Sequence, residues 1–222
     1  MTAPAPKPLV ALLLVLSFTT GLIDAISVLG LGKVFTANMT GNIVFLGFAA
    51  VGTPDFRAEL YIVALLAFLL GALLAGKLGT WLSAGPLARW LRIVAGLEAG
   101  LLWGAAGLSF LLPPGGATSA PLLAIIALTA VAMGLRNGTV RQLKVPDLTT
   151  TVLTLTLTGL AADSRAAGGG NPNWGRRLGS VATIGLGAGI GALLVIKVGL
   201  AIPLALTGTL ILGATLLCTR NA

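Results

Sequence analysis

The sequence predicts an all-α membrane protein, a polytopic bundle of six long transmembrane helices with two shorter broken or re-entrant helices. Only 9% of the residues are charged, whereas charged residues make up about 25% of a soluble domain. Six apolar segments approach or exceed the roughly 18–20 residues that cross a bilayer. They lie at about 9–31, 58–83, 90–112, 119–140, 178–199 and 202–219.

The composition also excludes several kinds of site. The chain contains no histidine and one cysteine, Cys218, so histidine metal sites and histidine-based catalytic triads have no ligands or base. We therefore expect no cofactor, no metal and no enzymatic activity. The net charge of +8 is expected to set membrane topology rather than to bind nucleic acid.

Two shorter segments, at about 38–52 and 149–162, decide the topology. If both dip into the membrane and return, eleven Lys and Arg residues lie on one face and three, Lys33, Arg57 and Lys197, on the other. If both cross, the division is six against eight. Because basic residues concentrate in cytoplasmic loops, the first arrangement is favoured, with six spans and both termini cytoplasmic.

Three matches in the same order indicate an internal repeat of residues 1–115 and 116–222. An odd number of crossings in each half predicts that the second repeat is inverted, an architecture that recurs in secondary transporters. The matched segments are GLIDA with GLRNG, VFTANMTGN with LTTTVLTLT, and GALLAGKLG with GALLVIKVG, at 21–25 and 134–138, 34–42 and 148–156, and 71–79 and 191–199.

Charged residues inside apolar segments are candidate functional groups, because an intramembrane charge normally faces the bundle interior and has a partner. We expect Asp24, Glu98 and Arg136, or two of them, to form a buried polar cluster with Asn137. Alternatively, the Arg136 side chain reaches the inner interface and the two carboxylates are static anchors.

Polar residues in the two short segments are the second group of candidates. TANMTGN, at 36–42, is interpreted as the break between a first helix and a re-entrant helix, where polar side chains satisfy exposed backbone. A helix beginning near Asn38 would direct its positive end at a substrate oxygen or anion. Spacing by one helical turn predicts one face for Thr36 and Thr40, and the second half repeats this pair. The candidates are Thr36, Asn38, Thr40, Asn42, Thr150 and Thr154.

A glycine-rich stretch, GLGAGIGA at 185–192, contains two overlapping G-x-x-x-G pairs. Such pairs allow close contact between membrane helices. The helix at 178–199 is therefore a candidate surface for homo-oligomers.

At GLIDAISVLGLGKVFTANMTGN the sequence resembles the YoaK-like family of bacterial inner-membrane proteins. The resemblance is carried by an intramembrane Asp24–Ala25 pair followed by V-F-x-A-N-M-T-G-N at 34–42. Asn137–Gly138 and the Thr-rich segment 149–151 extend it into the second half, which departs from the first by having Leu155 within Thr-Leu-Thr in place of T-G-N. The resemblance implies a multi-pass protein of the bacterial plasma membrane and implies no substrate.

The sequence predicts a small secondary transporter or facilitator of a small solute, with its site at the repeat interface. Asp24 or Glu98 would bind a proton or cation for coupling. The alternative is a non-transporting membrane scaffold or regulatory protein, whose polar motifs only satisfy backbone at helix breaks. In either case the lipid bilayer is the surrounding partner.

Overall fold

A computed structural model describes residues 6–113, 117–145, 150–151 and 153–220. The described part is all-helical, with no strand. Six helices are long and apolar enough to cross a membrane, which confirms the predicted polytopic helical bundle. They are α1 (Lys7–Gly30), α3 (Ala58–Trp81), α4 (Leu87–Leu108), α5 (Ala120–Leu143), α7 (Trp174–Val198) and α8 (Ala201–Cys218).

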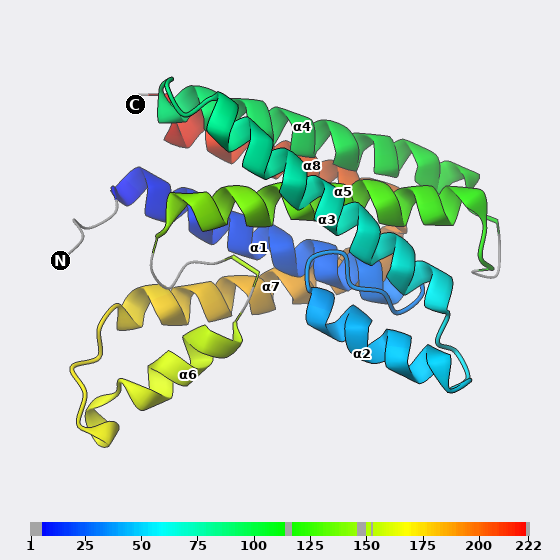
Figure 1. The fold of residues 1–222 in the computed structure, drawn as a ribbon, viewed down its shortest axis with the longest axis horizontal. Coiled ribbons are helices and arrows are strands. Elements are labelled where there is room, and N and C mark those ends of the chain that lie inside the picture. The colour runs from blue at the N-terminus through cyan, green and yellow to red at the C-terminus, as the bar shows by residue number, and fades with distance from the viewer. Residues whose placement is uncertain (1–5, 114–116, 146–149, 152, 221–222) are drawn as a thin grey trace.

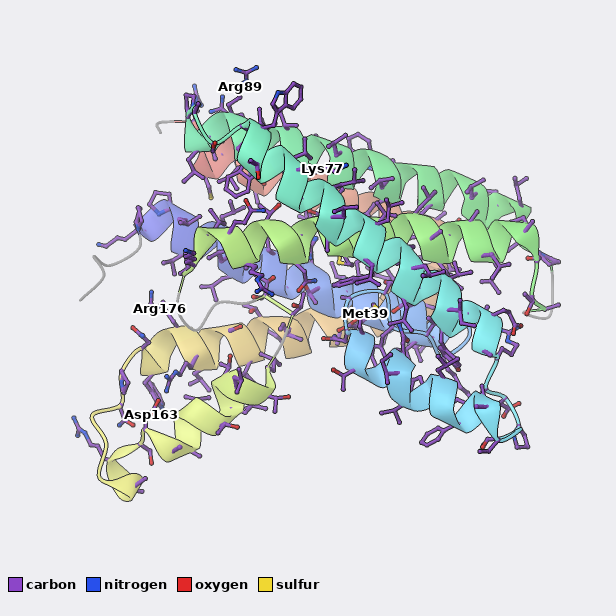
Figure 2. All side chains as sticks on the ribbon, in the orientation of Figure 1. Met39, Lys77, Arg89, Asp163 and Arg176 are labelled. Atoms are coloured by element: carbon purple, nitrogen blue, oxygen red, sulfur yellow. The ribbon has the colours of Figure 1, made fainter. Side chains whose placement is uncertain are left out.

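The remaining two α-helices, α2 (Met39–Ala50) and α6 (Thr154–Ala162), are too short to cross a bilayer. Figure 1 shows the six long helices lying side by side, with both ends of the chain at the same end of the bundle. The short helix α2 runs from partway along the length of the bundle towards the opposite end, and α6 runs towards the end that holds the termini. Met39, the first residue of α2, lies about midway along the bundle in Figure 2. Each short helix therefore ends at the same end of the bundle as the long helix that precedes it.

The centre of the bundle is formed by α1 and α5, which are the most buried of the long helices. Several of their hydroxyl groups bond within the same helix: Thr20 donates to the Leu16 carbonyl at 2.9 Å and Thr129 to the Ile125 carbonyl at 2.8 Å. This local pairing lets these two polar residues lie in an apolar core with their donors satisfied. In contrast, little of α7 is buried, as expected for a helix that faces lipid.

Close helix contacts are made at glycines, where a Cβ atom would collide with the neighbouring backbone. A Cβ on Gly21 of α1 would lie 2.1 Å from the Ile184 carbonyl of α7, and one on Gly187 would lie 1.9 Å from the Phe18 carbonyl. Gly71 and Gly134 join α3 to α5 in the same way. The glycines of α7 thus divide into two sets. Gly187 and Gly191 are buried against α1, whereas Gly185 and Gly189 face open space.

Each short helix is attached to one long helix. An aromatic cluster joins α2 to the start of α3, with ring centroids of Phe45 and Phe56 5.3 Å apart and those of Phe45 and Tyr61 5.6 Å apart. The far end of α6 is held to α7 by an ion pair between Asp163 and Arg177, with 2.7 Å between the atoms. The second short segment was predicted from residue 149, but the helix begins only at Thr154.

Candidate functional site

The first polar site lies at the break between α1 and α2. The Asn42 side chain bonds to both backbone groups of Phe35: its Oδ1 accepts from the Phe35 N–H at 2.9 Å, and its Nδ2 donates to the Phe35 carbonyl. Asn42 therefore closes the turn that precedes the re-entrant helix. Next to it, Asn38 Nδ2 donates to Asp24 Oδ2 at 2.6 Å. This bond fixes the start of α2 to α1.

Two polar atoms at this break have no hydrogen-bond partner in the described part of the chain. Asp24 Oδ1 and Thr36 Oγ1 are both buried. A buried polar group without a partner costs roughly 1–3 kcal/mol. The break therefore has unused acceptor and donor capacity that a water molecule or a solute could satisfy.

The second polar site lies at the corresponding break before α6. Here the Thr151 hydroxyl donates to Asn137 Oδ1, while Asn137 Nδ2 donates to the Met133 carbonyl of its own helix at 2.9 Å. Thr150 has a φ of +62°, which places its backbone in the left-handed region. Its hydroxyl is buried and without a partner among the described residues. At each break a side-chain hydrogen bond thus joins the loop to a long helix.

The third polar site is an ion pair between Glu98 and Arg136 in the centre of the bundle. Arg136 Nε donates to Glu98 Oε1 at 2.7 Å, and a second guanidinium nitrogen contacts the same oxygen. The remaining nitrogen donates to the Leu16 carbonyl at 3.1 Å and to Thr20 Oγ1 at 3.0 Å. The side chains are 1% and 3% exposed, so the pair is removed from solvent and lipid alike. It links α4, α5 and α1.

The structure separates the predicted cluster of Asp24, Glu98, Arg136 and Asn137 into these three sites. Glu98 and Arg136 are paired, whereas Asp24 bonds to Asn38 and Asn137 bonds to Thr151. The alternative in which Arg136 reaches the interface is wrong, because its side chain is buried and ion-paired.

The predicted shared face of Thr36 and Thr40 is also wrong. Helix α2 begins at Met39, so Thr36 lies in the preceding loop, where it is buried, and Thr40 is exposed. In the second half Thr150 is likewise buried outside the helix, and Thr154 is exposed at the first position of α6. Helical spacing does not hold across the start of a helix, and the start of α2, predicted near Asn38, lies between Thr36 and Thr40.

Thr20 was not among the predicted site residues, although it accepts a hydrogen bond from Arg136. The signal was available, because Thr20 lies four residues before Asp24, and residues at this spacing share a helix face. Thr139 was also missed. It is 4% exposed, and its hydroxyl has no partner in the described part of the chain.

A small cavity lies beside the ion pair. Its volume is about 20 Å³, and it is lined by Glu98, Arg136 and Thr139 among mostly apolar residues. This space holds about one water molecule. Neither Asp24 nor Thr40 lines it. Over the described residues, no group of three or more His, Cys, Asp or Glu side chains is placed to hold a metal ion.

Comparison with known proteins agrees with the membrane architecture. A family model described as a protein of unknown function, DUF1275, matches residues 12–217. The UPF0700 transmembrane protein YoaK of Bacillus subtilis (strain 168) is 35% identical over 167 residues, which are 73% of this chain and 69% of that protein. No solved structure matches.

Proposed function

The chain belongs to the DUF1275 family, with a YoaK-like sequence, and on that premise we propose that this multi-pass membrane protein carries a small polar solute across the bilayer. The observation that carries the proposal is the pair of short helices that start partway along the length of the bundle. Discontinuous helices of this kind form the substrate and ion sites of many secondary transporters.

Both helix starts offer groups that a solute could use. The N-terminal end of a helix carries partial positive charge and free N–H groups, which attract oxygen atoms and anions. At the first break Asp24 Oδ1 and Thr36 Oγ1 lack hydrogen-bond partners among the described residues. At the second break Thr150 Oγ1 lacks one as well. A small solute with oxygen acceptors and at least one donor fits this set. The Asp24 carboxylate is our candidate for binding a coupling proton or cation.

An inverted internal repeat is part of the proposal, and the helix contacts support it. If α1 to α4 correspond to α5 to α8, the packing of α1 on α7 becomes that of α5 on α3, and both pairings are observed. Likewise α2 packs on α3 and α6 on α7. The hydrogen bonds of Asp24 with Asn38 and of Asn137 with Thr151 occupy equivalent places, because 113 residues separate both partners in the two halves. Symmetry of this kind provides two related conformations for alternating access.

The glycine contacts refine the alignment of the two repeats. Gly71 approaches Val131 and Leu135 as Gly187 approaches Phe18 and Leu22. By its contacts Gly71 is thus equivalent to Gly187. The sequence match had aligned Gly71 with Gly191, which lies one helical turn further along α7. We keep residues 1–115 and 116–222 as the two repeats.

Orientation is part of the proposal. The termini share one end of the bundle in Figure 1, and Arg89 and Arg176 lie towards the same end in Figure 2. The excess of basic residues at this end favours the cytoplasm, in a bacterial plasma membrane. We propose no enzymatic reaction. Self-association would use the outward glycines Gly185 and Gly189, since Gly187 and Gly191 pack against α1.

One observation favours the alternative, a non-transporting scaffold or regulator. Arg136 bonds to both Glu98 and the Leu16 carbonyl, and the cavity beside the pair holds only about one water molecule. Such a pair could serve only to join α1, α4 and α5. The experiment below separates the two functions.

The test is solute flux into proteoliposomes across a panel of small polar solutes, with and without a proton gradient. For a transported solute, we expect Asp24→Asn to lower the rate at least tenfold, because the substituted amide loses the negative charge that binds the coupling ion. Asp55→Asn is the matched control, since Asp55 is an exposed loop carboxylate, and should transport like the wild type. Transport by Asp24→Asn at the wild-type rate would overturn the assigned site. Absence of flux for the whole panel would favour the scaffold.

A further inference from the structure

The cavity beside the Glu98–Arg136 pair has an unusually polar lining for its size. Its volume is about 20 Å³, and its polar lining residues are Glu98, Arg136, Thr139 and Thr215. Arg136 and Thr139 lie three positions apart on α5, so they share one face of that helix. The Thr215 hydroxyl is already used, because it donates to the Ile211 carbonyl at 2.8 Å.

The other three lining residues each carry a polar atom that makes no hydrogen bond within the described part of the chain. Arg136 Nη2 contacts Glu98 Oε1, which already accepts from Arg136 Nε, but it makes no hydrogen bond of its own. Glu98 Oε2 accepts no hydrogen bond. The Thr139 hydroxyl has no partner either, and this residue is only 4% exposed. The cavity lining thus offers two donors and one acceptor.

Thr139 differs in this respect from other buried threonines of the long helices. Thr20 of α1, Thr129 of α5 and Thr207 of α8 each donate to the carbonyl four residues earlier in their own helix. Thr139 makes no such bond to its own backbone. Because an unbonded buried hydroxyl is costly, this difference indicates that the partner of Thr139 lies inside the cavity.

We propose that the cavity is a binding site for one ordered water molecule, which accepts from Arg136 Nη2 and the Thr139 hydroxyl and donates to Glu98 Oε2. A buried water needs roughly 10–15 Å³ and about two to four polar partners, and the cavity provides both. Its charges favour a neutral occupant, because Arg136 repels a cation and Glu98 repels an anion. An apolar occupant would leave all three polar atoms unbonded.

The bound water makes Thr139 a member of the polar joint between α1, α4 and α5. Arg136 already links these helices through Glu98 and the Leu16 carbonyl, and the water adds the Thr139 hydroxyl to the same network. The water completes the hydrogen bonding of the ion pair and is not a transported solute. This site therefore does not rest on the proposed transport.

Replacement of Thr139 by valine gives opposite results for a hydrated and a dry cavity, because valine has nearly the same shape without the hydroxyl. With water bound, Thr139→Val loses a hydrogen bond and should lower the midpoint of thermal unfolding in detergent by about 2–4 °C. In a dry cavity the same change would remove an unbonded hydroxyl and raise the midpoint. Thr129→Val is the matched control, since the Thr129 hydroxyl bonds only within its own helix, and should change the midpoint little.

A high-resolution structure of the full-length protein tests the occupant directly. We expect one density peak within hydrogen-bonding distance of Thr139 Oγ1 and Glu98 Oε2 in the wild type. Thr139→Ser, which keeps the hydroxyl, should retain this peak, and Thr139→Val should lose it.

Two results would overturn the proposal. One is a wild-type structure that resolves other buried waters but has no peak in this cavity, and the other is a Thr139→Val midpoint that is unchanged or raised. If Thr139→Val does not fold, the wild type and Thr139→Ser still decide. Solute flux enters neither measurement, so failure of the transport proposal leaves this one standing.

Discussion

At the scale of single residues, contacts on two neighbouring helices constrain the Glu98–Arg136 pair. A charge in a membrane interior costs several kcal/mol unless it has partners, and Arg136 meets this requirement in three directions. Its planar guanidinium contacts Glu98, the Leu16 carbonyl and Thr20 at once. A lysine has a single charged atom and cannot reproduce this fork. The residue type thus follows from the positions of three acceptors on two neighbouring helices.

We predict that Glu98→Gln lowers the free energy of unfolding by about 3–5 kcal/mol, because it leaves Arg136 buried without a counter-charge. Thermal unfolding in detergent measures the change. The double variant Glu98→Leu/Arg136→Met should lose less than the sum of the single variants, since no lone charge remains. Arg89→Gln, at an exposed position, is the control and should unfold like the wild type. A Glu98→Gln protein as stable as the wild type would show that the pair contributes nothing.

At the scale of elements, glycine positions determine which helices pack most closely. A helix axis can approach another only where no Cβ intervenes. In α3, a Cβ atom added to Gly71 would lie 2.2 Å from the Val131 carbonyl oxygen of α5. A Cβ atom added to Gly76 would have no neighbour within 4 Å. The two glycines belong to one helix and differ only in the direction they face.

We therefore predict opposite results for two identical substitutions. Gly71→Ala should lower the thermal stability of the protein by several degrees, because α3 and α5 must separate. Gly76→Ala should leave it unchanged or raise it slightly, since alanine is the better helix former by about 1 kcal/mol. Equal effects of the two changes would contradict the assigned α3–α5 contact.

The sequence predicted that two short helices exist, but it did not predict correctly which polar residues lie on them. The polar TANMTGN stretch between apolar runs indicated a helix break, and Asn42 bonds to the Phe35 backbone there. The start of α2 was predicted near Asn38 and lies at Met39, so the prediction that Thr36 shares a helix face with Thr40 was wrong because Thr36 precedes that start. A helix start depends on where the loop is attached, and the bond between Asn38 and Asp24 makes that attachment across 14 residues.

At the scale of the whole molecule, six crossings and two re-entrant helices determine where each loop lies. The charge count predicted this arrangement because basic residues remain on the cytoplasmic side. The long helices of Figure 1 alternate in direction, and α2 and α6 add no crossing. Loops that flank α3 must therefore lie on opposite sides of the membrane.

Cysteine labelling tests this topology. In a Cys218→Ala background, Pro54→Cys before α3 should react with an impermeant thiol reagent added outside cells. Gly85→Cys after α3 should react only once the membrane is made permeable. Both residues are exposed loop positions, so they differ in side rather than in access. If α2 crossed the membrane completely, the two results would be exchanged.

The sequence by itself determined that this protein is a helical membrane bundle with six spans and two breaks. Those properties depend on apolar length, charge placement and local polarity, which are all properties of neighbouring residues. It also placed Asp24, Glu98, Arg136 and Asn137 inside the membrane, because their distance from the ends of apolar segments can be counted. Each partnership, however, joins residues between 14 and 120 positions apart.

Only the tertiary structure decided which polar residues meet. Glu98 pairs with Arg136 because α4 packs on α5, and Asp24 turns to Asn38 because the chain folds back before α2. Spacing within a helix gives the direction of each side chain but not the neighbour it faces. That neighbour is set by helix packing, here by glycines at which the backbone of one particular helix can approach closely. The sequence could therefore indicate the polar residues but not which of them are hydrogen-bonded or ion-paired to each other.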